Sequence, residues 1–154
     1  MATAVLIHGA FHGGWCWHET ARRLRGDGHQ VYAPSLSGLA DRSHLMSAEV
    51  DLEMHIRDIV NLIEWEGLDE VVLVGHSYGG MPVTGAADRV AERLAGLVYL
   101  DAFTPDDGDT AAAVRSAVPG AVELVAAADG ISLAGAGGGG GGAACCSAGG
   151  GAGG

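Results

Sequence analysis

Short apolar runs alternate along this chain with stretches whose apolar residues recur every three or four positions. Runs of four to ten residues that end at Gly, Pro or polar residues are typical of buried strands. Four such runs predict strands, at residues 4–7, 29–34, 69–74 and 94–103. Because these runs show little polar alternation, we expect both faces of their sheet to be covered.

Helices are predicted between the strands. Leu52, Ile56, Ile59 and Ile63 follow one another at spacings of 4, 3 and 4, which places them on one face of a helix that ends before Gly67. Two further helices are expected at residues 18–25 and 78–89. Strands that alternate with helices pair in parallel through right-handed crossovers, so the predicted fold class is α/β.

The pattern changes after Pro105. A short helix is expected at residues 110–117, and no later segment is predicted to be a strand. Of the last 20 residues, 12 are glycine. Such a segment has no large apolar side chain to bury, so residues 135–154 are expected to be disordered. We therefore divide the chain into a domain at 1–129 and a Gly/Ala-rich low-complexity tail at 130–154.

The charge balance excludes several functions. The 154 residues include 19 acidic and 8 basic side chains, all of the latter arginine, for a formal net charge of −11. This charge disfavours nucleic acids and anionic membranes as partners. The absence of lysine excludes a Schiff base and a phosphate-loop lysine. The sequence also lacks a signal-like or membrane-length apolar segment and a disulfide framework, so the cytoplasm is the expected location.

The stretch VVLVGHSYGG contains the candidate catalytic residue. It places Ser77 in a Gly-x-Ser-x-Gly turn between a predicted strand and a predicted helix. Side chains at Gly75 and Gly79 would collide with their surroundings in such a turn, and the serine is forced into strained backbone angles. This arrangement favours Ser77 as a nucleophile, with the N–H groups of Tyr78 and Ala10 stabilising an oxyanion. The alternative is that Ser77 only caps the following helix.

Three segments together resemble a known family. AVLIHGAFHGGWCW, VVLVGHSYGG and LVYLDAFTPDDGDT look like the N-terminal half of an α/β-hydrolase of the methylesterase and hydroxynitrile-lyase-like branch. The resemblance implies a truncated α/β-hydrolase fold with about four strands in the spatial order second, first, third, fourth. It also implies that Ser77 accepts the acyl group. Lyase members tend to carry a hydroxylated residue where this chain has Gly9, so glycine favours ester hydrolysis.

The family's catalytic triad runs in the order Ser, acid, His, but no histidine follows Ser77 in this sequence. His76 is expected to point away from the serine, and His8 and His12 to belong to the oxyanion loop. Solvated or half-buried positions are expected for His18, His29, His44 and His55. Asp101 is a weak candidate for the triad acid, although a hydrogen-bonding loop role is the simpler expectation. Trp15 and Trp17 are expected to pack the loop and the first helix.

The resulting hypothesis is a serine hydrolase that acts on small carboxylic esters without a cofactor or a metal. Its activity is expected to be impaired, because the triad histidine is absent from this sequence. A non-catalytic remnant and a hydroxynitrile-lyase-like enzyme remain as alternatives. Neither Cys145 nor Cys146 has a neighbouring ligand that would support a metal or redox site. The sequence does not indicate an oligomeric state.

Overall fold

The computed structural model describes residues 1–116, 123–127 and 130–134. The chain divides into two units, Met1–Ala117 and Val118–Gly154, which are described separately. The expected disorder of residues 135–154 and the Cys145–Cys146 pair lie outside the described residues. No described helix is long and apolar enough to cross a membrane.

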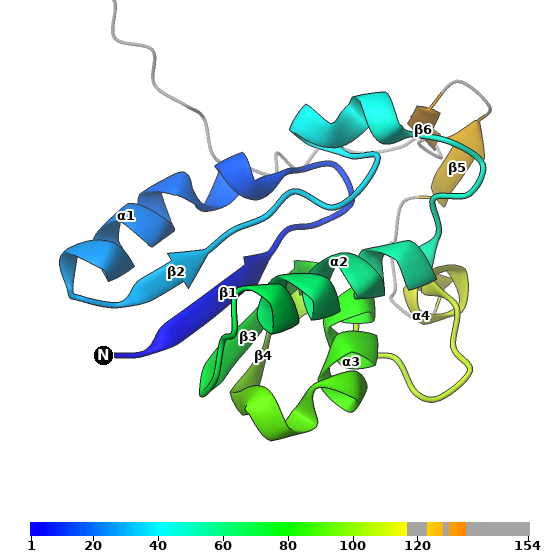
Figure 1. Cartoon of the computed structure of the whole chain (residues 1–154). Coiled ribbons are helices and arrows are strands. Elements are labelled where there is room, and N and C mark those ends of the chain that lie inside the picture. The colour runs from blue at the N-terminus through cyan, green and yellow to red at the C-terminus, as the bar shows by residue number, and fades with distance from the viewer. Residues whose placement is uncertain (117–122, 128–129, 135–154) are drawn as a thin grey trace, which may run out of the picture. The chain divides into compact units, whose positions relative to one another are not determined.

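The first unit contains a parallel four-stranded sheet with the order β2-β1-β3-β4, which confirms the predicted strand order (Figure 1). In the centre of the sheet, Ala4 pairs with Val31 on one side and with Val72 on the other. The strands are β1 (Thr3–Ile7), β2 (Gln30–Tyr32), β3 (Val71–Ser77) and β4 (Leu94–Ala102).

Helices connect these strands as predicted. The α-helices are α1 (His18–Gly26), α2 (Leu52–Trp65), α3 (Gly80–Arg89) and α4 (Ala111–Ser116). Short 3₁₀ helices are η1 (Gly14–Trp17), η2 (Ala40–Leu45) and η3 (Ala91–Arg93). At the start of α2, Asp51 caps the helix because its Oδ1 accepts a hydrogen bond from the Met54 N–H, at 2.9 Å.

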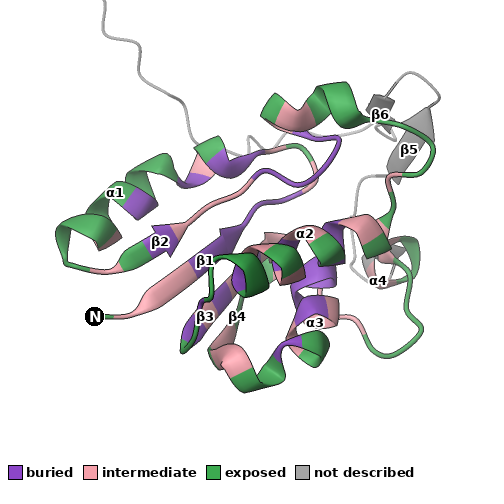
Figure 2. Ribbon diagram, in the orientation of Figure 1, coloured by how far each residue is buried: buried purple, intermediate pink, exposed green. Residues whose placement is uncertain are grey.

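Alternate residues of β1 enter two separate cores. Val5 and Ile7 pack in a cluster with the buried faces of α2 and α3, whereas Leu6 packs in a second cluster with Trp17 and Ala21. The sheet therefore has η1 and α1 on one face and α2 and α3 on the other, with buried residues on both faces (Figure 2). This double coverage explains why the strands read as continuous apolar runs.

The second unit corrects the expectation that no strand follows Pro105. Strands β5 (Glu123–Ala127) and β6 (Gly130–Ala134) form an antiparallel pair in which Ala127 lies opposite Gly130. A hairpin needs only local pairing across a short connection, so it does not require the helical crossover on which the sequence prediction was based. Strand β6 also falls inside the segment interpreted as a low-complexity tail.

Strand β4 is the last strand of the four-stranded sheet and exposes apolar side chains. Val98, Tyr99 and Leu100 have 41, 36 and 49% of their surface accessible. The central strand β3, in contrast, buries Val71 and Leu73 completely. An edge strand with free backbone groups and apolar side chains is a template for pairing with another chain.

We therefore predict that the 154-residue chain self-associates through β4. Leu100→Lys should shift it toward the monomer in light scattering coupled to size-exclusion chromatography, because a charged side chain on an edge strand disfavours pairing. Trp65→Lys, at an exposed position of α2, serves as the control and should leave association unchanged. A parent chain that is a monodisperse monomer with a sharp cooperative melt would contradict this prediction.

Candidate active site

Ser77 is the last residue of β3 and occupies a strained turn. Its φ is 53°, in the left-handed region that residues with a side chain rarely adopt. Within the turn, the Gly79 N–H donates to the His76 carbonyl at 2.8 Å, and α3 begins at Gly80. Ser77 thus lies between a parallel strand and the helix that follows it, at the carboxyl end of the sheet where α/β proteins bind ligands.

The two glycines beside Ser77 have no room for side chains. A Cβ atom at Gly75 would lie 2.7 Å from Cγ2 of Val83, and one at Gly79 would lie 2.8 to 2.9 Å from three backbone carbonyl oxygens. Those oxygens belong to Ile7, His8 and His76. The predicted collisions are therefore present at both positions. The turn also packs directly against the end of β1.

The loop after β1 meets the turn at Gly9. A Cβ atom there would lie 3.1 Å from Ser77 Cβ and 3.5 Å from Ser77 Oγ. The next residue, Ala10, and the residue after the serine, Tyr78, have backbone N–H groups that donate no hydrogen bond within the described part of the chain. Two unpaired backbone donors therefore occur in the segments that adjoin the Ser77 hydroxyl, as an oxyanion site requires.

The His76 side chain lies beside Gly9, in the loop after β1. His76 Nδ1 and Ser77 Oγ are both 3.5 Å from the same point, the position that a Gly9 Cβ would take. The positive φ of Ser77 breaks the alternation that would direct neighbouring strand side chains to opposite faces. The imidazole ring also lies edge-on to Trp17, with ring centroids 6.2 Å apart. Burial lowers the pKa of His76, the positive charge of His12 lowers it further, and Asp101 opposes both effects.

Asp101 lies opposite this turn in β4. The pairing of β3 and β4 shifts between His76 and Ser77, so that Leu100 and Ala102 have partners and Asp101 forms a bulge with a φ of 45°. The carboxylate is exposed and accepts no hydrogen bond from any described residue. The bulge places Asp101 outside the strand pairing, and its expected hydrogen-bonding role stays a prediction.

His8 is buried and has a structural role. Its Nε2 accepts a hydrogen bond from the Leu36 N–H at 3.0 Å, so the proton of the neutral ring is on Nδ1, which donates to the Gly9 carbonyl at 2.7 Å. His12 lies in the same loop, with its ring 5.5 Å from that of Trp15. Trp17 packs as expected, but Trp15 is 51% exposed.

Sequence reasoning missed His55. Positions 18 and 44 are exposed and His29 is partly buried, as expected, but His55 is only 6% exposed and its Nδ1 lies 2.9 Å from the Tyr78 hydroxyl oxygen. The signal was present in the periodicity. His55 falls three residues after Leu52 and four before Ile59, on the apolar face of α2. Among the residues that the structure describes, no group of three potential ligands is arranged to hold a metal ion.

Gly79→Ala should destabilise the fold because its methyl group would meet three backbone oxygens. Overpacking of this kind costs about 1 to 3 kcal/mol in the free energy of unfolding, which urea denaturation measures. Gly26→Ala is the matched control, since nothing lies within 4 Å of the added Cβ. Equal stability of the two variants would mean that the turn is not as closely packed as described.

Buried His8 should make stability depend on pH. Burial lowers its pKa below the ordinary value of 6.5, although the hydrogen bond to the Gly9 carbonyl opposes this shift. Below pH 6.5 the unfolded chain takes up a proton that the folded chain does not. The free energy of unfolding therefore decreases as the pH is lowered, by up to about 1.4 kcal/mol per pH unit for one group. Urea denaturation of His8→Gln between pH 7.5 and 5.5 should show a flatter dependence than the parent. An unchanged slope would contradict this assignment.

Comparison with known proteins agrees with this geometry. A model of the alpha/beta hydrolase family matches residues 4–144. The carbendazim hydrolyzing esterase of Nocardioides sp. is 56% identical over 110 residues, which cover 71% of this chain and 46% of that protein. Methylesterase 1 of Arabidopsis thaliana is 37% identical over 105 residues, covering 66% of this chain and 40% of the relative.

Solved structures show the same relationship. An extracellular alpha/beta-hydrolase from a Paenibacillus species is 34% identical and superposes with a TM-score of 0.66, over 71% of this chain and 44% of that one. A pyrethroid hydrolase from Sphingobium faniae is 30% identical with a TM-score of 0.63, over 71% and 43% of the two chains. The chain thus spans less than half the length of these relatives. On the match of the family model and of these esterases, the chain belongs to the alpha/beta hydrolase family.

Proposed function

We propose that this chain carries the nucleophile half of a serine hydrolase for carboxylic esters of small molecules. The proposal rests on one observation, that Ser77 lies next to the loop after β1. The serine hydroxyl lies beside Gly9. Ala10 follows Gly9 and Tyr78 follows Ser77, and neither backbone N–H donates a hydrogen bond within the described residues. In this role Ser77 attacks the ester carbonyl, the two N–H groups stabilise the oxyanion, and water releases the acid from the acyl-enzyme.

The relatives support an ester as the substrate. One is named a carbendazim hydrolyzing esterase and several are named methylesterases. The small space between Gly9 and Ser77 also supports hydrolysis over the lyase reaction, because a hydroxylated side chain at position 9 would crowd the serine. No cofactor is part of the proposed mechanism. The cytoplasmic location stays a prediction.

This sequence does not supply a histidine in the triad's position to accept the proton of Ser77. None of its seven histidines follows the serine, whereas the family's triad takes its histidine from there. Asp101 remains only a weak candidate for the acid, since its carboxylate is exposed and has no histidine to orient. We therefore propose that the 154-residue chain retains oxyanion stabilisation but has little turnover.

The test compares this chain with a chimera in which the C-terminal portion of the carbendazim hydrolyzing esterase follows the matched segment. The isolated chain should hydrolyse p-nitrophenyl acetate only weakly, since loss of triad members costs about 10⁶ in turnover and leaves about 10³ to 10⁴ over water. The chimera should turn over the ester readily and react with a fluorophosphonate.

Ser77→Ala should abolish both reactions of the chimera, while Ser43→Ala, at an exposed position of η2, should leave them unchanged. A folded chimera that hydrolyses esters independently of Ser77 would disprove the proposed nucleophile. Ordinary enzyme rates in the 154-residue chain itself, dependent on Ser77, would mean that a histidine upstream of Ser77 is the base.

A further inference from the structure

A buried histidine of α2 contacts the residue that follows the proposed nucleophile. His55 Nδ1 lies 2.9 Å from the hydroxyl oxygen of Tyr78, although the two residues are 23 positions apart in the sequence. Their rings meet edge to face, with centroids 5.7 Å apart and an interplanar angle of 80°. The contact therefore joins the helix α2 to the turn that holds Ser77.

The second nitrogen of His55 determines the direction of this hydrogen bond. Nε2 lies 2.9 Å from the Ser37 carbonyl oxygen, which can only accept, so Nε2 must carry the proton. In the neutral ring Nδ1 is then an acceptor, and the Tyr78 hydroxyl must donate to it. Burial raises the pKa of Tyr78 to about 12, which keeps that hydroxyl protonated as a donor. The Nε2–H tautomer of His55 therefore donates to the Ser37 carbonyl and accepts from the Tyr78 hydroxyl.

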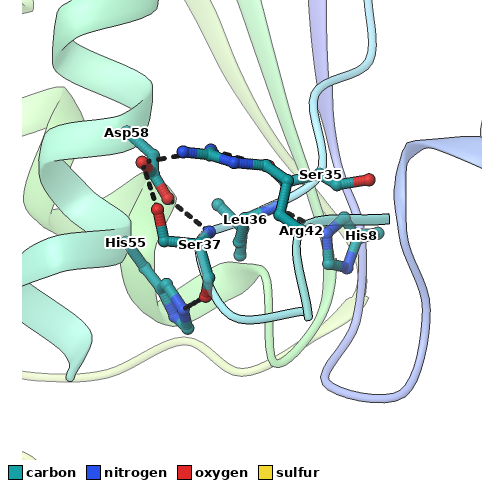
Figure 3. Close-up of polar contacts among 7 residues, drawn as sticks. All are labelled: His8, Ser35, Leu36, Ser37, Arg42, His55 and Asp58. Carbon is teal, nitrogen blue, oxygen red and sulfur yellow. Dashed lines mark hydrogen bonds and ion pairs between the residues drawn. The ribbon is translucent and has the colours of Figure 1, made fainter. Parts of the chain in front are cut away.

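The position of the imidazole is itself fixed by a polar network (Figure 3). Asp58, one helical turn after His55, accepts hydrogen bonds from the Ser37 N–H at 2.6 Å and from the Ser37 hydroxyl at 2.9 Å. Arg42 pairs with the same carboxylate at 3.3 Å and donates to the Ser35 carbonyl at 3.1 Å. His55 and Asp58 therefore hold Ser37 from one helix, and Ser37 in turn orients the His55 ring.

Tyr78 is therefore hydrogen-bonded through both its backbone and its side chain. Its carbonyl accepts the Met81 N–H at 2.9 Å in the first turn of α3, and its hydroxyl is bound to α2 through His55. Its own N–H remains unpaired within the described residues. Restraint of the side chain limits rotation of this residue, and hence of the N–H that adjoins Ser77. Donors that are oriented before the reaction stabilise an oxyanion more strongly than donors that must reorient.

We propose that His55 is a positioning residue for the Ser77 site: by accepting the Tyr78 hydroxyl proton in a hydrogen bond, it holds the Tyr78 N–H in place to stabilise the oxyanion. This inference rests on the proposed function of Ser77. It assigns no proton transfer to His55, whose two nitrogens are both engaged away from the serine. His55 acts only through Tyr78.

The first test measures how fast a small fluorophosphonate modifies Ser77 in the 154-residue chain, by intact mass spectrometry at high reagent concentration. His55→Phe keeps a planar ring but removes the acceptor, and should slow modification about tenfold, a fraction of what loss of a whole oxyanion donor costs. Tyr78→Phe should have the same effect. The double variant should be no slower than either single variant, because both remove the same hydrogen bond.

Two control variants distinguish a positioning role of His55 from a general effect on folding. His55→Gln offers both a donor and an acceptor, so it should retain the parent rate within about twofold. Glu64→Gln, at an exposed site on the same helix, should have no effect. If His55→Phe is folded and reacts at the parent rate, the inference is wrong. If instead Ser77→Ala is modified as fast as the parent, the proposed function is wrong.

Nitrogen-15 NMR of the imidazole rings provides a readout that does not depend on reactivity. The parent should show His55 as the Nε2–H tautomer, and Tyr78→Phe should shift the His55 Nδ1 resonance. His55→Phe should also shift the amide resonance of Tyr78, since that N–H loses its restraint. A His55 ring protonated on Nδ1, or a Tyr78 amide that is unaffected by His55→Phe, would overturn the inference.

Discussion

The site depends on the close backbone packing between the turn after β3 and the end of β1. Gly79 lies so near the carbonyl oxygens of Ile7, His8 and His76 that no side chain fits there. Next to this contact, the loop at Gly9 lies against Ser77, and α3 starts at the following residue, Gly80. Since the two segments are packed backbone to backbone, a side chain at Gly79 would push the turn away from the end of β1.

The same end of the sheet is framed by histidines that act as hydrogen-bonding bridges. His8 binds the backbone of Leu36, and His55 binds that of Ser37, so two imidazoles from different elements hold one loop. This loop follows β2 and belongs to no sheet, so side chains must satisfy its backbone groups. A neutral imidazole suits this task because it offers one donor and one acceptor on opposite sides of a rigid ring. Loop and turn are thereby linked through Tyr78.

The match to relatives covers the segments around Ser77, and it spans less than half of each relative's length. Relatives match about two thirds of this chain but less than half of their own length. Within the matched part, the sheet ends at β4, whose Val98 and Leu100 side chains are exposed. The strands that position Ser77 are nonetheless both present, because all five residues of β1 pair with Val71–Gly75 of β3. The residues proposed to stabilise the oxyanion thus all lie within the matched part of the chain.

The sequence by itself determined the α/β class, the helical face at Ile56, Ile59 and Ile63 and, through the family resemblance, the strand order. It also located the Ser77 turn, because glycine spacing and apolar runs are local properties of the chain. Only the tertiary structure showed that His55 is buried against Tyr78 and that His76 approaches Gly9. Those contacts join segments far apart in the sequence or depend on a single positive φ, and periodicity carries no information about either. The hairpin of β5 and β6 was missed for a different reason, since its pairing depends on a local connection and not on helical crossovers.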